Sequence, residues 1–199
     1  MNVYKQLVPA YFIPREWIYV ELLRCLEKSK QPRVAIDLYN DMKQHRVSMT
    51  FNTCRSFMSC FSVKLGKEQL PEYVRIMEEI IQWAAFFDIE TDDFMKSQMI
   101  RIYCLNGQYE RAWECMEKFS QNKFEPSFVA LSSLLHGTIV RNNKADAMKI
   151  LKMIAEKGFV LNVKSRNTYY RHLEFTANES YEIDQLFVHR PNRVSSQRK

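Results

Sequence analysis

A pattern of small, large and polar residues recurs at a spacing of 35 residues in the second half of the chain. The segment GQYERAWECMEKFSQNKFEPS, residues 107–127, can be laid over NNKADAMKILKMIAEKGFVLN, residues 142–162, so that Ala112 coincides with Ala147. Few residues are identical, yet the order of small, large and polar positions is nearly the same. Self-similarity at a fixed period of about 20–50 residues is the signature of repeat architectures.

Inside each copy the apolar residues have the spacing of an amphipathic helix. In the first copy they recur at i, i+3, i+4, i+7 and i+10, on Tyr109, Ala112, Trp113, Met116 and Phe119. This spacing places them on one continuous face of a helix. A further helical pattern precedes each copy, and Gly107 or residues 141–143 supply the turn between the two helices. The repeated unit is therefore a helix, a short turn, a second helix and a loop.

The same unit can be placed along most of the chain. Ala35, Ala112 and Ala147 each precede a large apolar residue by seven positions and mark second helices. The first two of these alanines are 77 residues apart, seven more than two periods, which predicts a longer second helix and loop in the second unit. The predicted units are residues 16–50, 51–92, 93–127 and 128–162, with a partial unit at 163–175 that caps the array.

The composition favours the same architecture. With only 4 Gly and 6 Pro among 199 residues, the chain has few of the turn residues that sheet proteins need. We therefore predict an all-α fold: a right-handed superhelical solenoid of about four helix-turn-helix repeats with a terminal capping helix. Residues 1–15 are expected to form an N-terminal extension, and residues 176–199 a basic, flexible tail.

The charge and the cysteines indicate which kind of partner and which redox environment the protein has. The net charge of +6 is compatible with an anionic partner such as RNA. Five cysteines without a CxxC pair indicate reduced thiols rather than a disulfide framework. Because no apolar run approaches the roughly 18 residues of a membrane span, we expect no membrane partner. The first fifteen residues contain no acid, a property of mitochondrial targeting segments, although Pro9 and Pro14 interrupt a helix there.

The period and the loops resemble the pentatricopeptide repeat family. The family pattern has an alanine in the second helix, a large apolar residue seven positions later and a Pro near the end of the loop, as in KFEPS at residues 123–127. Its aromatic-Asn-Thr opening is similar to TFNT at residues 50–53 and, more loosely, to SRNTYY at residues 165–170. The resemblance extends over about residues 15–175. A period of 35 rather than 34 separates it from the tetratricopeptide repeat.

The resemblance implies RNA recognition, in which each repeat reads one base with two or three side chains. One of these side chains lies early on the first helix, and another lies at the end of the loop. Carried over to this sequence, the candidate RNA-binding residues are Ser97 with Ser127, Ser132 with Asn162, and Asn167 of the terminal unit. The first unit has Val20, which offers no hydrogen bond, with Thr50, and Arg55 takes the helix position in the second unit.

Two interpretations of these polar residues stay open. Ser132 with Asn162 resembles a purine-reading combination, most like that for adenine, but both can also be ordinary helix-start and loop residues. The basic tail can lie along an RNA backbone or be a solvated terminus. Its cations are Arg190, Arg193, Arg198 and Lys199.

No motif indicates catalysis or a bound cofactor. The sequence has no Gly-rich phosphate loop, no HExxH and no zinc-finger spacing, so we expect no metal, no cofactor and no small-molecule substrate. A nucleophile at Cys104 or Cys115, served by His136, has no supporting motif. We therefore expect a protein that is not an enzyme.

These features favour a structural, RNA-associated subunit of a mitochondrial ribosome or of its assembly particle. A short array with few base-reading side chains lacks the affinity to find a transcript alone, whereas other ribonucleoprotein subunits supply further contacts in an assembly. Two alternatives stay open: a sequence-specific factor for the stability or processing of organellar RNA, and an adaptor that binds protein only.

Overall fold

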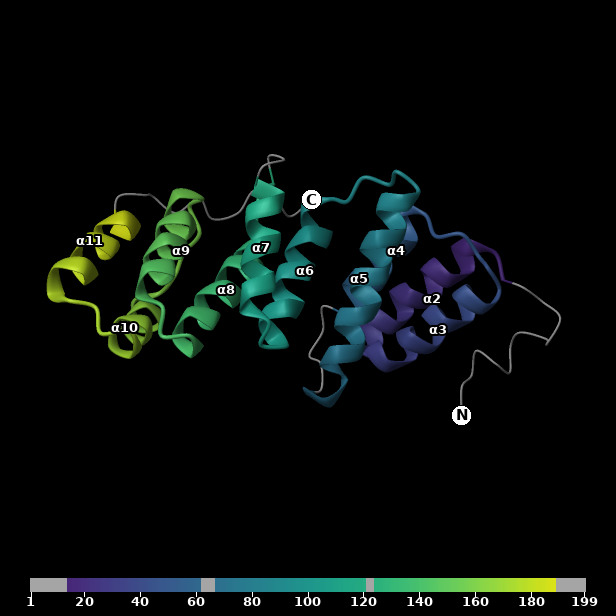
Figure 1. The fold of residues 1–199 in the computed structure, drawn as a ribbon, viewed down its shortest axis with the longest axis horizontal. Helices are drawn as coiled ribbons and strands as arrows, with labels where there is room; N and C mark the ends of the chain where they lie inside the picture. The colour runs from purple at the N-terminus through teal and green to yellow at the C-terminus, as the bar shows by residue number, and fades with distance from the viewer. Residues whose placement is uncertain (1–13, 62–66, 121–123, 189–199) are drawn as a thin grey trace. The chain divides into compact units, whose positions relative to one another are not determined.

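The computed structural model describes residues 14–61, 67–120 and 124–188, and all regular structure within them is helical (Figure 1). The elements are α2 (Glu16–Ser29), α3 (Pro32–Gln44), α4 (Phe51–Cys60), the short 3-10 helix η1 (Lys67–Gln69), α5 (Leu70–Phe86), α6 (Asp93–Leu105), α7 (Tyr109–Ser120), α8 (Phe128–Val140), α9 (Lys144–Glu156), α10 (Val163–His172) and α11 (Ala177–Val188). Ten α-helices and no strand in the described residues confirm the all-α prediction.

The helices follow one another as hairpins, each with a first and a second helix. The pair α2 and α3 forms one hairpin, α4 and α5 form the next, and α8 and α9 form another further along the chain. Residues in the left-handed region end several helices: Lys30 (φ 55°) after α2, Gly107 (φ 75°) after α6 and Asn142 (φ 50°) after α8. A left-handed residue at this position ends the helix and turns the chain away from the helix axis.

The second hairpin contains the expected lengthened helix. Its second helix, α5, has 17 residues, whereas the second helices α3, α7 and α9 have 13, 12 and 13 residues. The prediction of a longer second helix in this unit is therefore confirmed, whereas the predicted longer loop is wrong: the loop after α5, residues 87–92, is no longer than the loop after α3, residues 45–50. The last turn of α5 carries Trp83 and Phe86, and Phe87 follows directly after the helix.

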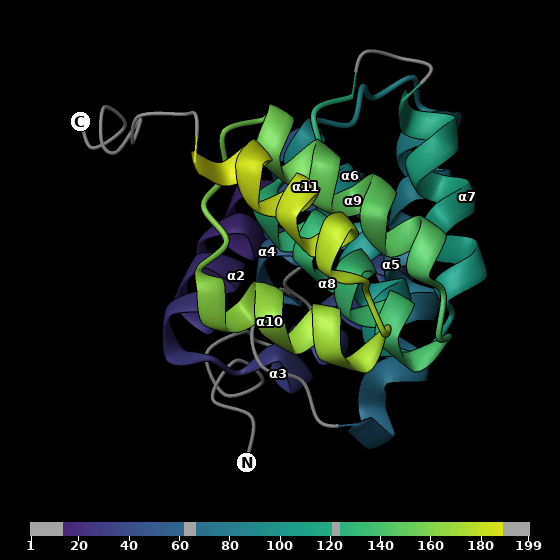
Figure 2. The same cartoon turned by 90° about the vertical axis from the view of Figure 1, so that its left-hand side faces the viewer.

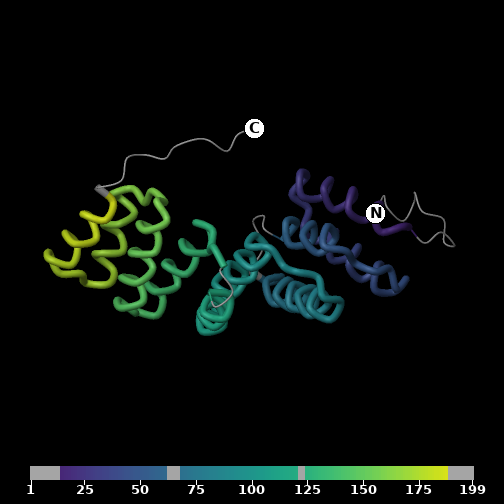
Figure 3. The backbone as a smooth tube through the Cα atoms, turned by 90° about the horizontal axis from the view of Figure 1, so that it is seen from above, coloured from purple at the N-terminus to yellow at the C-terminus, as the bar shows by residue number. Residues whose placement is uncertain are grey.

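The chain divides into two compact units, of which the first comprises residues 1–102. Within it α2 packs against α3 and α4, and α4 packs against α5 (Figure 3). A row of aromatic rings runs through this core. Tyr39 meets Phe57 edge to face at 5.6 Å between centroids, Phe57 stacks on Phe61 at 6.3 Å, and Phe61 contacts Tyr73 at 4.9 Å. Tyr39 lies on α3, Phe57 and Phe61 lie on α4 and at its C-cap, and Tyr73 lies on α5. The contacts between these rings therefore hold the three helices together.

The second unit comprises residues 103–199. In it α8 packs against α7 and α9, and α11 lies alongside α9 (Figure 2). Helix α7 meets α8 at Gly137, where an added Cβ atom would overlap the ring of Tyr109. Ala112 and Ala147, the small residues at matching positions of successive units, are both 0% exposed. The close helix packing expected at these alanines is therefore confirmed.

The structure places a helix where the sequence indicated the start of a flexible tail at residues 176–199. Helix α11 occupies Ala177–Val188 and begins with a reciprocal capping box. The Glu179 amide donates to the Thr176 hydroxyl at 3.3 Å, and the Thr176 amide donates to the Glu179 carboxylate at 2.7 Å. This T-x-x-E pattern is the sequence signal for the helix. The apolar face is narrow, with Ile183 as its fully buried residue, and for this reason the periodicity fades there.

Candidate nucleic-acid interface

The residue that ends each predicted unit also caps the first helix of the next unit. Thr50 precedes α4, Asp92 precedes α6, Ser127 precedes α8 and Asn162 precedes α10. The side-chain oxygens of Asp92, Ser127 and Asn162 accept hydrogen bonds from the amide three residues later, at 2.8, 3.3 and 2.8 Å. These loop-end residues are therefore N-caps, and their short polar side chains satisfy amides that a helix start leaves unpaired.

In the fourth unit, Ser132 and Asn162 keep part of their hydrogen-bonding capacity. Ser132 is half-buried on α8, and its hydroxyl donates to the Val129 carbonyl at 3.1 Å. Asn162 is exposed, and its side-chain oxygen is used by the cap. The amide NH2 group of Asn162 makes no hydrogen bond within the described residues. These two side chains can therefore offer a ligand an amide donor and a hydroxyl acceptor.

The corresponding positions of the first and third units are less accessible. Val20 is 6% exposed, and Ser97, a predicted RNA-binding residue, is 1% exposed. The structure therefore places both side chains in the protein interior. The Thr50 hydroxyl donates to Glu16 Oε1 at 2.6 Å, so this loop-end residue already has a protein partner.

In the second unit, the helix residue and the loop-end residue bind each other. Arg55 Nε lies 2.8 Å from Asp92 Oδ2, and the guanidinium Cζ lies 4.8 Å from the centroid of the Phe94 ring. An ion pair of this kind uses groups that would otherwise be available to a base or a phosphate. The sequence indicated Arg55 as the helix residue of this unit but not its pairing with Asp92, for which no local pattern gives a signal.

A cationic stripe surrounds Asn167 on α10. Lys164, Asn167 and Arg171 are exposed and recur at i, i+3 and i+7, which places them on one helix face. Helix α10 contains no acidic residue, and within the described part of the chain neither Lys164 nor Arg171 makes an ion pair. One amide and two unpaired cations suit a base edge and the phosphates beside it. The predicted tail residues Arg190, Arg193, Arg198 and Lys199 lie outside the described residues.

Exposed apolar side chains lie one turn ahead of the candidate reading positions on two first helices. Trp17 on α2 is 61% exposed, and Val129 on α8 is 44% exposed. They precede Val20 and Ser132 by three residues and therefore share a helix face with them. Exposed apolar surface at this position suits the flat face of a base. The sequence signal for this surface is an apolar residue three positions ahead of the reading position.

The buried cysteines are not activated nucleophiles. Burial raises the pKa of the Cys54 thiol to about 11 and that of the Cys60 and Cys104 thiols to about 12. These thiols therefore stay protonated at neutral pH, and the thiolate is the reactive form. In the part of the chain that the structure describes, no group of three or more His, Cys, Asp or Glu side chains is placed to hold a metal ion. None of the described helices is both long enough and apolar enough to cross a membrane.

Two segments of the chain match the family model of the PPR repeat, residues 17–47 and residues 95–124. The first of these segments covers most of α2 and α3, and the second covers most of α6 and all of α7. The chain therefore contains pentatricopeptide repeats, as its 35-residue period and its loops predicted. Among curated proteins, none matches the sequence significantly.

Solved structures of pentatricopeptide repeat proteins share the fold. The PPR domain of Arabidopsis thaliana protein-only RNase P 1 in complex with tRNA has a TM-score of 0.72 at 13% identity, over 89% of this chain and 93% of that one. Nuclear proteinaceous RNase P 2 from A. thaliana has a TM-score of 0.62 at 13% identity, over 86% of this chain and 42% of that one. PPR10, a maize protein, in complex with an 18-nt psaJ RNA element has a TM-score of 0.61 at 18% identity, over 93% of this chain and 25% of that one. The chain thus spans less than half of the latter two proteins.

Proposed function

We propose that this chain is a non-catalytic, RNA-associated protein that acts as a structural subunit of a ribonucleoprotein. The observation that carries the proposal is the exposed face of α10, where Lys164 and Arg171 each lie about one turn from Asn167 and the helix itself contains no acidic residue. A face of this kind attracts the phosphates of RNA without regard to sequence. The solved PPR structures in complex with tRNA and with an 18-nt RNA element support RNA as the ligand class.

Few of the base-reading side chains are free to contact RNA. This favours a structural subunit over a protein that finds and binds one transcript by itself. Val20 and Ser97 are buried, and Arg55 is paired with Asp92. Each correctly read base contributes discrimination on the order of 1–3 kcal/mol, so an array with few free reading positions discriminates weakly. In a large assembly, neighbouring subunits supply the missing contacts through a high effective concentration. We infer the mitochondrial ribosome or its assembly particle as this assembly, and the mitochondrion as its location.

The RNA part of the proposal can be tested with the full chain and fluorescent single-stranded RNA of mixed sequence. The double variant Lys164→Ala/Arg171→Ala should bind about tenfold more weakly, and its dependence of log K on log salt should fall by about 1.4, since each phosphate contact to single-stranded RNA contributes about 0.7. The matched control is Lys152→Ala/Lys157→Ala, which removes two exposed cations from α9 and its C-cap. Equal binding by both variants would contradict the α10 interface.

The second candidate function is a sequence-specific factor for RNA stability or processing. The free amide of Asn162 and the accessible hydroxyl of Ser132 favour it, because together they can read one base edge. The test is competition between short RNAs of equal length. Ser132→Ala/Asn162→Ser should relax base preference at one position if the chain reads sequence, with the Ser cap keeping α10 in place. Co-sedimentation with ribosomal particles that persists in this variant is the result expected for a structural subunit.

A further inference from the structure

A pocket of about 330 Å³ lies between the end of α3 and the end of α5, within the first unit. The buried side chains of Met42 and Met49 line it, and Trp83 and Phe87 form its aromatic side. Methionine is flexible and polarisable, and for this reason it recurs on surfaces that accept apolar side chains of different shape. The pocket belongs to the second helices and their loops, not to the α10 face proposed for RNA.

The aromatic side of the pocket continues onto an exposed apolar surface. The rings of Trp83 and Phe87 lie 4.0 Å apart between centroids, and Phe86 meets Phe87 edge to face at 4.9 Å. Phe86 is 81% exposed and Phe87 is 52% exposed. Single exposed apolar residues are ordinary, but adjoining aromatic rings at the mouth of a pocket mark an interaction surface. Aromatic anchors of this type carry much of the binding energy at protein interfaces.

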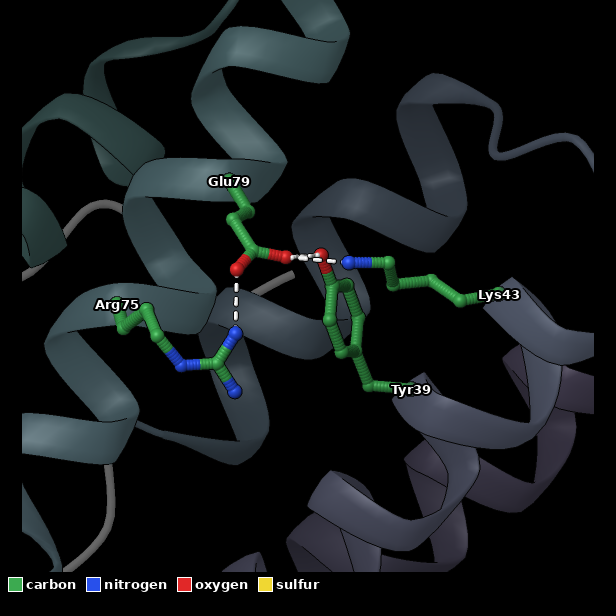
Figure 4. Close-up of polar contacts among 4 residues, drawn as sticks. All are labelled: Tyr39, Lys43, Arg75 and Glu79. Carbon is green, nitrogen blue, oxygen red and sulfur yellow. Dashed lines mark hydrogen bonds and ion pairs between the residues drawn. The ribbon is translucent and has the colours of Figure 1, made fainter.

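The pocket has a cationic rim. Lys43 and Arg46 are its charged residues, and no acidic residue lines it. Lys43 Nζ lies 2.8 Å from Glu79 Oε2, so this cation already has a protein partner (Figure 4). Arg46 is exposed, follows α3 with a φ of 54° and makes no ion pair within the described residues. The pocket is therefore electrostatically complementary to one negative group placed beside an apolar one.

These features fit a protein segment better than an RNA strand. One unpaired cation gives a phosphate backbone a single contact, whereas RNA binding depends on several. The ring of Trp83 is already covered by Phe87, which leaves less of its face for stacking by a base. In contrast, an apolar side chain can enter the pocket while a neighbouring carboxylate meets Arg46.

We propose that this pocket docks a protein segment that presents an aromatic or long aliphatic side chain next to an Asp or Glu. The proposal goes beyond the RNA-associated function, because it concerns a different surface and a different class of partner. It assigns the end of α5 a role in joining this chain to another protein.

The first test is selection of 12-residue peptides from a random display library on the immobilised full chain. The expected result is enrichment of an aromatic or long aliphatic residue with an Asp or Glu within two positions. Selection of nothing, or of peptides without an acidic residue, would overturn the proposal. The same library on the Phe86→Ser/Phe87→Ser variant should lose this enrichment. A Val140→Ser variant, altered at a 62% exposed apolar residue of another helix, should keep it.

The second test follows one selected synthetic peptide in solution. Replacing Trp17 and Trp113 with Phe leaves Trp83 as the single tryptophan of the chain, and its emission should shift as the peptide binds. Affinity should fall at least about tenfold in Phe87→Ser and also in Arg46→Glu. Circular dichroism melting of each variant establishes that it is folded.

An RNA competition experiment tests the alternative that the pocket binds RNA instead of a protein segment. Mixed-sequence single-stranded RNA should neither compete with the peptide nor shift Trp83 emission, and Phe87→Ser should bind RNA as the wild type does. Loss of RNA binding in Phe87→Ser with unchanged peptide binding would show that the pocket serves RNA and would refute the docking proposal. Loss of the peptide site alone leaves the proposed α10 function intact, so the two can fail separately.

Discussion

Arg55 and Asp92 bind each other, with Arg55 Nε 2.8 Å from Asp92 Oδ2. They occupy the two positions of the second repeat that the resemblance assigns to base reading. The cation that could meet RNA is therefore neutralised by the loop-end residue of its own repeat. Asp92 also accepts a hydrogen bond from the Met95 amide at 2.8 Å, so one carboxylate both caps α6 and holds Arg55.

Asp92→Asn should increase RNA affinity by freeing Arg55. Asn caps helices as well as Asp does, so α6 keeps its start while the ion pair is lost. We expect about threefold tighter binding of mixed-sequence RNA at low salt, with a salt dependence steeper by about 0.7. The measurement is fluorescence anisotropy across a salt series. The matched control, Asp93→Asn, removes the same charge from the exposed neighbouring residue. An equal gain in the control would attribute the effect to net charge rather than to the freed guanidinium.

Glu79 should make the stability of the first unit depend on acidity. Its carboxylate accepts hydrogen bonds from Tyr39 Oη at 2.7 Å and from Lys43 Nζ at 2.8 Å, and it pairs with Arg75 (Figure 4). Burial acts to raise the pKa of Glu79, but the hydrogen bonds from Lys43 and Tyr39 and the nearby cations outweigh it and lower the pKa from 4.5 to about 2. The contribution is therefore complete above about pH 4.5 and is lost as the pH falls toward 2.

Urea unfolding of Glu79→Gln measures this contribution. We expect the free energy of unfolding to fall by about 1 kcal/mol at pH 7, since the carboxylate is partly exposed to solvent. Between pH 4.5 and pH 2, the variant should lose less stability than the wild type. Glu72→Gln, an exposed carboxylate on the same helix, serves as the control and should retain the wild-type pH dependence. Parallel pH profiles for wild type and Glu79→Gln would argue against the depressed pKa.

Gly137→Ala should destabilise the second unit, because the new methyl group would overlap the Tyr109 ring. We expect a loss of about 1–3 kcal/mol in the free energy of unfolding, the usual cost of overpacking a helix contact. Tyr109→Ala removes the ring and should make the glycine replaceable. In a double-mutant cycle, the double variant should therefore be more stable than the sum of the two single losses predicts. Additive losses would mean that α7 and α8 do not meet at this glycine.

Asp184→Ala should loosen α11 from α10. Asp184 Oδ1 accepts hydrogen bonds from Arg166 Nε at 2.7 Å and from Tyr170 Oη at 2.9 Å, and the Arg166 side chain is only 8% exposed. The substitution leaves a buried cation without its partner, at a cost of about 2 kcal/mol. Hydrogen exchange should accelerate in α11 before it does in α8 and α9. Glu182→Ala, on the exposed side of α11, should leave the exchange unchanged.

Helix contacts and helix lengths that depend on local periodicity could be predicted from the sequence. Ala112 and Ala147 indicated close helix contacts, and both are fully buried. The separation of Ala35 and Ala112, seven residues more than two periods, indicated a longer second helix, and α5 is the longest helix described. These signals depend on spacing along one helix or one hairpin, and that spacing is visible in a single sequence.

Contacts between residues far apart in the chain could not be predicted in the same way. Arg55 and Asp92 are 37 residues apart, and Thr50 and Glu16 are 34 apart. Their pairing depends on how successive hairpins stack, for which composition and periodicity give no register of side chains. The burial of Ser97 has the same origin, since a hydroxyl of this size fits either an interior or a surface position.

The capping role of the loop-end residues limits how such a repeat can be reprogrammed. An engineer who wishes to alter base preference at Asn162 must also keep the start of α10, because the same oxygen accepts the Ser165 amide. Asn, Asp, Ser and Thr meet both requirements, whereas an apolar or long cationic substitute would cost about 1 kcal/mol of helix stability. The residue types that can be used at this position are therefore limited as much by the backbone amides of the following helix as by the base to be read.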